Sequence, residues 1–261
     1  MTAVILAAGY ATRLYPLTLQ APKCLLRVGG RPLLDWLCEK IEGVPDLEEL
    51  VIVTNAKFHT EIEAWNETAD FSFPVRVLND GTESNEARLG AIGDLNFAIT
   101  RCRMQSDILL LASDNLFDAS LKDFVHFGKL KNGAPVLGLY DIGEPQAASK
   151  KFGVAQINAS QEIVDLEEKP AEPKTSLIAT GVYYFPKGTL HFVSEYLSDK
   201  DAKDAPGHFL RWLLGRMKIF GFVFLGLWYD IGDLNAFQEA DKIFSARGGS
   251  APGGNERQAS L

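Results

Sequence analysis

The stretch VILAAGYATRLYPLTLQAPK, residues 4–23, carries the strongest structural signal in the chain. Its first four residues form a continuously apolar run, which is typical of a buried parallel strand. The small residues Ala8, Gly9 and Ala11 follow, and they leave room for backbone amides to approach a phosphate closely. The stretch therefore predicts a buried strand that leads into an anion-binding turn.

Two cations follow this turn. Arg13 offers a planar fork of donors suited to bidentate phosphate contact, and Lys23, set off by Pro22, supplies a point charge nearby. A small anion is therefore the expected ligand.

Composition bounds the class of protein. A length of 261 residues with 46% hydrophobic content suits a large α/β domain with a sizeable core. The net charge of −8 argues against a protein that binds nucleic acids or anionic membranes in general. No apolar run approaches the length that crosses a bilayer.

The three cysteines, Cys24, Cys38 and Cys102, show neither metal-ligand spacing nor a disulfide framework. A reducing cytoplasm is therefore the expected location.

We expect one domain over residues 1–246 and a disordered tail over 247–261.

Strand and helix signals alternate along the chain. The predicted strands are residues 3–7, 50–54, 74–78, 108–111, 136–140, 153–157, 163–166, 180–185 and 219–227, and the predicted helices are 32–41, 61–65, 89–99, 206–216 and 235–244. This order predicts an α/β fold with a Rossmann-like, doubly wound, mostly parallel (mixed) sheet and helices on both faces.

The stretch 4–23 resembles the signature of the sugar-1-phosphate nucleotidylyltransferases, a strand followed by L-A-[GA]-G-x-G-T-R-L-x-P-x-T and then P-K. Ala11 stands where the family has its second glycine, so this turn must avoid a positive φ there or adopt one with strain. The resemblance implies a nucleotide-diphospho-sugar transferase fold. It also implies that the nucleotide is bound by Leu6, Ala7, Ala8, Gly9, Ala11, Thr12, Arg13, Asn79, Gly90 and Asp114.

Two aspartates match further family motifs. Asp114 follows the predicted strand 108–111 in a G-D-N-like motif in which Ser113 replaces the glycine, and Asp230 lies in a W-x-D-I-G motif. Taken alone, Asp114 would read as a helix cap or a turn residue. Asp233 can cap the helix after Asp230, which leaves Asp230 free. The resemblance implies that Asp114 and Asp230 hold Mg²⁺.

Three more segments resemble the family's sugar-phosphate pocket: KFGVAQ at 151–156, EEKP at 167–170 and TGVYYF at 180–185. By this resemblance Glu168 accepts hydrogen bonds from sugar hydroxyls and Lys169 holds the sugar phosphate. In isolation these two residues would be a solvated charged turn. The resemblance implies a sugar-phosphate site of Gly153, Glu168, Lys169, Gly181 and Val182.

The segment NDGTESNEARLGAIGDL, residues 79–95, echoes the family's nucleobase motif G-L-A-x-A only at Leu89, Gly90 and Ala91. Its polar residues either read a base edge or form a solvated loop with a helix cap, and both interpretations stay open. These residues are Asn79, Asp80, Thr82, Ser84 and Asn85.

The implied reaction is attack by a hexose-1-phosphate, such as glucose-1-phosphate, on the α-phosphorus of dTTP or UTP, which releases pyrophosphate. Arg13, Lys23 and Lys169 would be the catalytic cations. Residues 1–116 would form a nucleotide half and 117–234 a sugar half, with a closing helix at 235–246, and a homo-oligomer is possible.

Three alternatives remain open. A cytidylyl- or guanylyltransferase of the same fold would differ in base choice, and a regulatory homologue would bind a nucleotide sugar without catalysis. A nicotinamide dehydrogenase also begins with a strand and a small-residue turn, but the chain has no G-x-G-x-x-G there.

Overall fold

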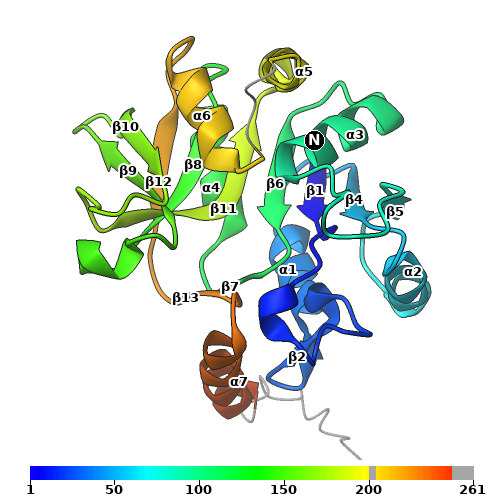
Figure 1. Cartoon of the computed structure of the whole chain (residues 1–261). Helices are drawn as coiled ribbons and strands as arrows, with labels where there is room; N and C mark the ends of the chain where they lie inside the picture. Colours follow the sequence, from blue (N-terminus) through cyan, green and yellow to red (C-terminus); the bar gives the residue numbers. More distant parts are fainter. Residues whose placement is uncertain (200–203, 249–261) are drawn as a thin grey trace, which may run out of the picture.

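A nine-stranded mixed sheet forms the centre of the protein. A computed structural model describes residues 1–199 and 204–248 (Figure 1). The strand order is β10-β9-β11-β6-β1-β4-β5, and β8 lies beside β11 with β12 beside β8. These strands are β1 (Thr2–Leu6), β4 (Glu49–Thr54), β5 (Val75–Asn79), β6 (Ile108–Ala112), β8 (Val136–Asp141), β9 (Gly153–Ile157), β10 (Ile163–Glu168), β11 (Leu177–Phe185) and β12 (Phe220–Phe224).

Strand β1 lies in the middle of a parallel block. It pairs with β4 on one side and β6 on the other, and β4 pairs in turn with β5. Successive side chains of β1 enter opposite cores, with Ala3 and Ile5 on one face and Val4 on the other. Both faces are therefore buried, which explains the continuously apolar sequence of this strand.

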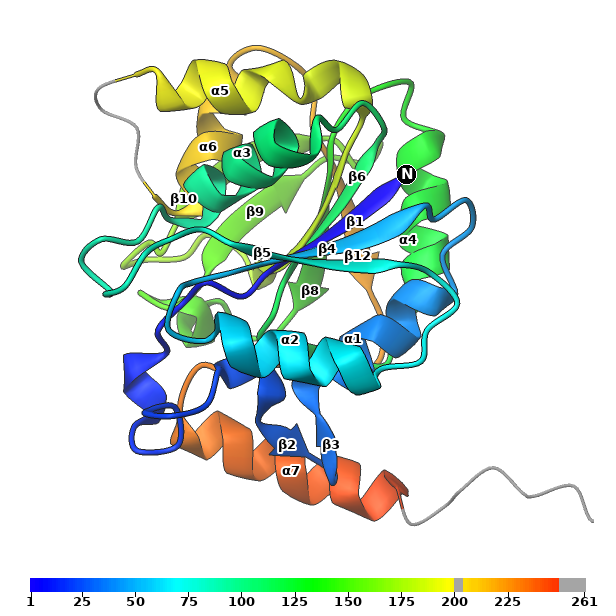
Figure 2. The ribbon, with the colours of Figure 1, turned by 90° about the vertical axis from the view of Figure 1, so that its right-hand side faces the viewer.

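Helices cover both faces, as Figure 2 shows. One core contains residues of α1 (Leu33–Glu42), α2 (His59–Thr68) and α4 (Leu121–Lys129). The other contains residues of α3 (Ala91–Cys102), α5 (His191–Leu197) and α6 (Pro206–Leu214). This arrangement confirms the predicted α/β class with a doubly wound, mixed sheet.

The second half of the sheet is mainly antiparallel. Strand β11 pairs antiparallel with β6, β8 and β9, and β9 and β10 form the predicted hairpin. β12 is parallel to β8. Because β11 joins β6 directly, the hairpin lies close to the carboxyl ends of the parallel strands.

The prediction of one strand over 219–227 is wrong. Strand β12 ends at Phe224, Leu225 is 82% exposed, and Gly226 adopts a φ of 94° that turns the chain. The chain then forms β13 (Trp228–Asp230), which pairs antiparallel with β7 (Asn115–Phe117) in a separate small sheet. This turn moves the motif with Asp230 away from the main sheet.

Other elements were missed or extended. Helices α4 and α5 were not predicted, and neither was the hairpin of β2 (Arg27–Val28) and β3 (Arg31–Pro32). The last helix, α7, spans Leu234–Gly248, beyond its predicted end at 244. The prediction that a disordered tail begins at residue 247 is wrong at its start, because residues 247 and 248 belong to α7. Residues 249–261 lie outside those that the structure describes.

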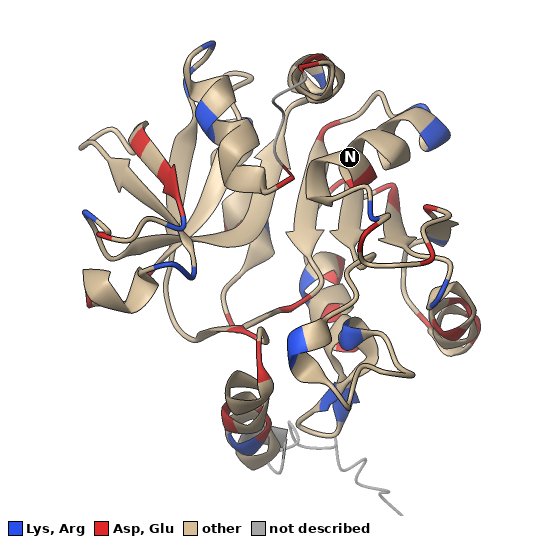
Figure 3. Cartoon of the chain, in the orientation of Figure 1, with Lys and Arg blue, Asp and Glu red and all other residues tan. Residues whose placement is uncertain are grey.

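Acidic and basic residues are interspersed over the ribbon (Figure 3). Within residues 1–199 and 204–248, the structure contains no helix whose length and apolar content would allow it to span a membrane.

Candidate active site

The loop after β1 is held from both sides. Asn55 follows β4 and donates from Nδ2 to the carbonyl of Ala8 at 2.9 Å, and Tyr10 donates its hydroxyl to the carbonyl of Thr82 at 3.0 Å. Asn55 and Tyr10 are both buried. Buried hydrogen bonds of this kind fix the backbone of the loop before any ligand arrives.

Ala11 adopts a positive φ, the strained one of the two conformations expected for it. Its φ of 46° and ψ of 43° are left-handed, a conformation that costs a non-glycine residue roughly 1–2 kcal/mol. Its carbonyl accepts from Thr18 Oγ1 at 2.8 Å and from the Leu14 amide at 3.0 Å. These bonds hold the turn that starts the short 3-10 helix η1 (Thr12–Leu14), on which Arg13 lies.

Asp114 lies just past β6, where it meets Lys23. Lys23 Nζ donates to Asp114 Oδ2 at 2.8 Å, and their side chains are 12% and 32% exposed. Burial alone would raise the pKa of Asp114, but the charge and hydrogen bond of Lys23 hold that pKa below its ordinary value. The carboxylate is therefore ionised at neutral pH.

Asp230 is brought to the same place by the pairing of β13 with β7. Asp230 lies opposite Asn115 in this pairing, and the Ile231 amide donates to the carbonyl of Asp114 at 2.9 Å. Burial, and then the charge of Asp114, raise the pKa of Asp230 to about 7. Two carboxylates thus stand side by side with opposite shifts in pKa.

Arg13 completes this arrangement. A Cβ built on Gly232 would lie 3.0 Å from Asp230 Oδ2 and 3.7 Å from Arg13 Nη2, so the guanidinium approaches Asp230 over this glycine. Arg13, Lys23, Asp114 and Asp230, hereafter the charged cluster, gather two cations from the stretch 4–23 and two carboxylates from two other segments.

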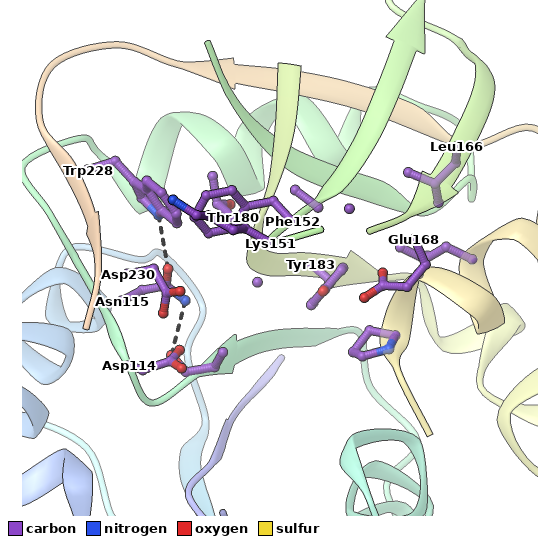
Figure 4. A pocket seen from close by; sticks show the side chains of 17 residues that line it. Asp114, Asn115, Lys151, Phe152, Leu166, Glu168, Thr180, Tyr183, Trp228 and Asp230 are labelled. Atoms are coloured by element: carbon purple, nitrogen blue, oxygen red, sulfur yellow. Dashed lines mark hydrogen bonds between the residues drawn. The ribbon is translucent and has the colours of Figure 1, made fainter. Parts of the chain in front are cut away.

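Three cavities adjoin one another here: Ala112 lines all of them, and residues of the charged cluster line two of them. The loop cavity, about 230 Å³, is lined by residues that include Leu6, Ala7, Gly9, Ala11, Arg13, Lys23 and Asp114. The α3 cavity, about 360 Å³, is lined by residues that include Leu6, Ala8, Gly9, Gly90, Asp94, Glu168 and Lys169. The hairpin cavity, about 150 Å³, is lined by residues that include Asp114, Phe152, Gly153, Glu168, Gly181, Trp228 and Asp230 (Figure 4).

Glu168 lies where the α3 and hairpin cavities meet, and two glycines make space for it. A Cβ on Gly207 would lie 2.0 Å from Glu168 Oε2, and a Cβ on Gly153 would lie 3.2 Å from the same atom. Burial raises the pKa of Glu168. Lys169 is 57% exposed with Nζ 3.9 Å from Glu168 Oε1, so its ammonium remains accessible to a ligand.

The family model for nucleotidyl transferases matches residues 2–246. The chain belongs to this family. Among relatives, it is 27% identical to the bifunctional protein GlmU of Methanococcus aeolicus, over 89% of this chain and 51% of that protein. It is 29% identical to the UTP–glucose-1-phosphate uridylyltransferase AglF of Haloferax volcanii, over 73% of this chain and 74% of AglF. The chain spans about half the length of the GlmU relatives that it matches.

Solved structures show the same fold. The chain superposes on a UDP-glucose pyrophosphorylase without ligand with a TM-score of 0.80, at 19% identity, over 94% of this chain and 98% of that one. A second structure of a UDP-glucose pyrophosphorylase, in complex with UDP-glucose, gives a TM-score of 0.79 at 20% identity, over 94% of this chain and 98% of that one.

Three predicted site residues of this family member lie outside the residues that line the three cavities. Asn79 accepts from the Gly81 amide at 2.8 Å and so shapes a turn. Val182 is fully buried in the core that α1, α2 and α4 cover, and Thr12 is exposed at the start of η1. Asp233 caps α7, since its Oδ1 accepts from the amides of Asn235 and Ala236, each at 3.0 Å.

Two further residues reach the site. They lie within the quoted motifs, but no role was predicted for them. Asn115, 2% exposed, accepts from Trp228 Nε1 at 2.9 Å and donates to the Ala112 carbonyl at 3.4 Å (Figure 4). Tyr183 lines the hairpin and α3 cavities. The available signals were that Asn115 directly follows Asp114, and that Tyr183 shares a strand face with Gly181.

The two carboxylates of this site suit Mg²⁺ that is also bound by substrate phosphates better than a metal ion that is coordinated by protein side chains alone. Within the residues that the structure describes, no group of three or more His, Cys, Asp or Glu side chains could hold a metal. Asp114 and Asp230 supply two carboxylates, and Mg²⁺ is commonly held by one or two carboxylates together with substrate phosphates. The raised pKa of Asp230 marks a place where a cation would relieve repulsion between the two carboxylates.

Proposed function

We propose that this protein transfers a nucleotidyl group from dTTP or UTP to a hexose-1-phosphate such as glucose-1-phosphate, with release of pyrophosphate. The observation that carries this proposal is that three adjoining cavities share Ala112 and that the charged cluster lines two of them, the loop cavity and the hairpin cavity. The name of AglF supports a uridylyl donor and a glucose-1-phosphate acceptor.

Each cavity matches one part of the reaction. The loop cavity offers backbone amides and two cations to a triphosphate, and the α3 cavity continues it toward a nucleoside. The hairpin cavity offers Glu168 to sugar hydroxyls, and Lys169 lies at the border as a cation for the sugar phosphate. We assign the nucleotide to residues 1–116, the sugar phosphate to 117–234 and closure of the domain to 235–246.

The reaction needs in-line positioning and neutralisation of charge on phosphate oxygens. Arg13 would hold the departing pyrophosphate, while Lys23 and Lys169 would hold the two reacting phosphates. Lys23 is already oriented by its 2.8 Å bond to Asp114. Mg²⁺ held by Asp114 and Asp230 would supply a Lewis acid for the phosphate oxygens.

We further propose a cytoplasmic enzyme that acts on small molecules and not on nucleic acid or membranes, with homo-oligomerisation as an open possibility. The three cysteines are free thiols, and Cys24 and Cys38 are buried, which suits a reducing compartment.

A panel of nucleoside triphosphates and sugar-1-phosphates, assayed for released pyrophosphate, tests this function. We expect UTP or dTTP with glucose-1-phosphate to give the highest kcat/KM, and Lys23→Met to reduce it by orders of magnitude. A preference for CTP or GTP would support the alternative specificity. Binding without turnover for every pair would support a regulatory homologue and refute catalysis.

A further inference from the structure

Residues 204–207, with the sequence DAPG, belong to two cavities at once. Asp204, Ala205 and Pro206 line the α3 cavity, and Pro206 and Gly207 line the hairpin cavity. The segment ends in the first turn of α6, a helix that packs on both β10 and α3. Residues 204–207 therefore form a wall that the two cavities share.

Asp204 anchors one end of this segment to the start of α3. Its Oδ1 accepts from the amide of Ala91, the first residue of α3, at 2.9 Å, and its Oδ2 lies 3.2 Å from Arg88 Nε. The amides and the dipole at the start of a helix favour such a carboxylate. Gly90 makes the approach possible, because a Cβ there would collide with Asp204 Oδ1.

Gly207 supports Glu168 at the other end of the segment. A Cβ on Gly207 would collide with Glu168 Oε2, so the carboxylate of Glu168 rests against the backbone in the first turn of α6. This start of a helix also favours the negative charge next to it. The position of the first turn of α6 thus helps to decide where the Glu168 carboxylate lies.

The chain between Asp204 and Gly207 is stiff. Ala205 precedes a proline, which favours the extended conformation that it adopts, with φ −68° and ψ 134°. Pro206 has its φ fixed by its ring. The amide of His208 donates to the carbonyl of Ala205 at 3.0 Å. A displacement of Asp204 would therefore be passed on to Gly207 and not absorbed between them.

We propose that Asp204 is a positioning residue: anchored on α3, it holds Gly207, and through Gly207 the carboxylate of Glu168, in the place where sugar hydroxyls bind. This inference rests on the proposed function, because it takes Glu168 as the acceptor for the sugar. Asp204 is not among the described residues that line the hairpin cavity, so its effect on the sugar is transmitted through the segment.

Calorimetric titration with UDP-glucose and with UDP, both in the presence of Mg²⁺ and without pyrophosphate, tests this inference without turnover. The two ligands differ by the glucose. Asp204→Ala removes the anchor, so Kd for UDP-glucose should rise by about five- to tenfold, while Kd for UDP should change by less than about twofold. Asp204→Asn keeps an oxygen for the Ala91 amide and should keep Kd for UDP-glucose within about threefold of wild type.

A double-mutant cycle with Glu168 separates positioning from a general loss of structure. In a Glu168→Ala background the group that Asp204 positions is missing, so adding Asp204→Ala should raise Kd for UDP-glucose by less than about twofold. Glu162→Ala is the matched control. It breaks a 2.8 Å ion pair with Lys218 in the same half of the protein and should leave Kd for both ligands unchanged.

Equal weakening of UDP and UDP-glucose by Asp204→Ala would overturn the inference, because Asp204 would then act on the nucleotide. Losses that add in the double mutant would also overturn it, since Asp204 would then act independently of Glu168. Failure of the proposed function looks different: UDP-glucose and UDP would bind with the expected pattern, but no sugar-1-phosphate would release pyrophosphate.

Discussion

Asp230→Asn should make the protein more stable and less active. The pKa of Asp230 is about 7, against an ordinary value of 3.8, and each unit corresponds to 1.36 kcal/mol. Ionising this half-buried group would therefore cost the folded state about 2–4 kcal/mol above pH 7, the lower figure allowing for its partial exposure. Asparagine keeps the shape of the side chain and removes this cost.

The sign follows from proton binding. Between about pH 4 and pH 7 the folded protein holds the Asp230 proton and the unfolded chain has lost it, so this group makes stability fall as the pH rises through that window. The variant lacks this decline. The gain from Asp230→Asn should be small at pH 4.5 and reach its full size above pH 7.

Urea unfolding of both proteins at pH 4.5 and pH 8, without divalent cations, measures this difference. Asp70→Asn on the exposed surface is the matched control and should change the free energy of unfolding by less than about 0.5 kcal/mol at either pH. Pyrophosphate release with Mg²⁺ should fall by orders of magnitude in Asp230→Asn. A variant that is less stable than the wild type at pH 8, or a gain equal at the two pH values, would refute the reasoning.

Three further changes probe the site. Asp114→Asn should lower the rate of pyrophosphate release by orders of magnitude while the thermal midpoint shifts little, and near-normal release would contradict the metal assignment. Gly207→Ala should displace Glu168, because the added Cβ would clash with Glu168 Oε2. This change should raise KM for the sugar phosphate but not for UTP. The control Gly188→Ala adds a Cβ that meets nothing within 4 Å, so it should change neither KM. Ala11→Gly relieves the left-handed strain but adds unfolded-state entropy, so the free energy of unfolding should change by at most about 1 kcal/mol with kcat retained, and a large loss of kcat would show that the methyl group has a role.

The parallel half of the sheet could be predicted because its strands are buried on both faces and therefore carry continuous apolar runs. Helix α4 was not predicted, although its sequence carries helix signals: Ser120 is an N-cap residue that accepts from the Asp123 amide, and Leu121, Phe124 and Val125 recur at helical spacing. The break after Phe224 was not readable, because an exposed leucine looks the same in sequence as a buried one.

Some of the site could likewise be predicted from the sequence and some could not. Arg13 and Lys23 lie in one short motif, so local spacing was enough to place them together. The bond of Asn115 to Trp228 joins residues 113 positions apart. This contact does not follow from a pattern in the sequence, because it is set by tertiary packing.

The pairing of β13 with β7 has a consequence for synthesis on the ribosome. The Ile231 amide is bonded to the carbonyl of Asp114, so the second carboxylate reaches its place only after most of the chain has been made. A nascent chain can complete the parallel strands and the loop that carries Arg13 long before then. Such a chain would carry Arg13 and Lys23 but lack the pairing of Asp114 with Asp230, so under the proposed function activity should arise only late in translation.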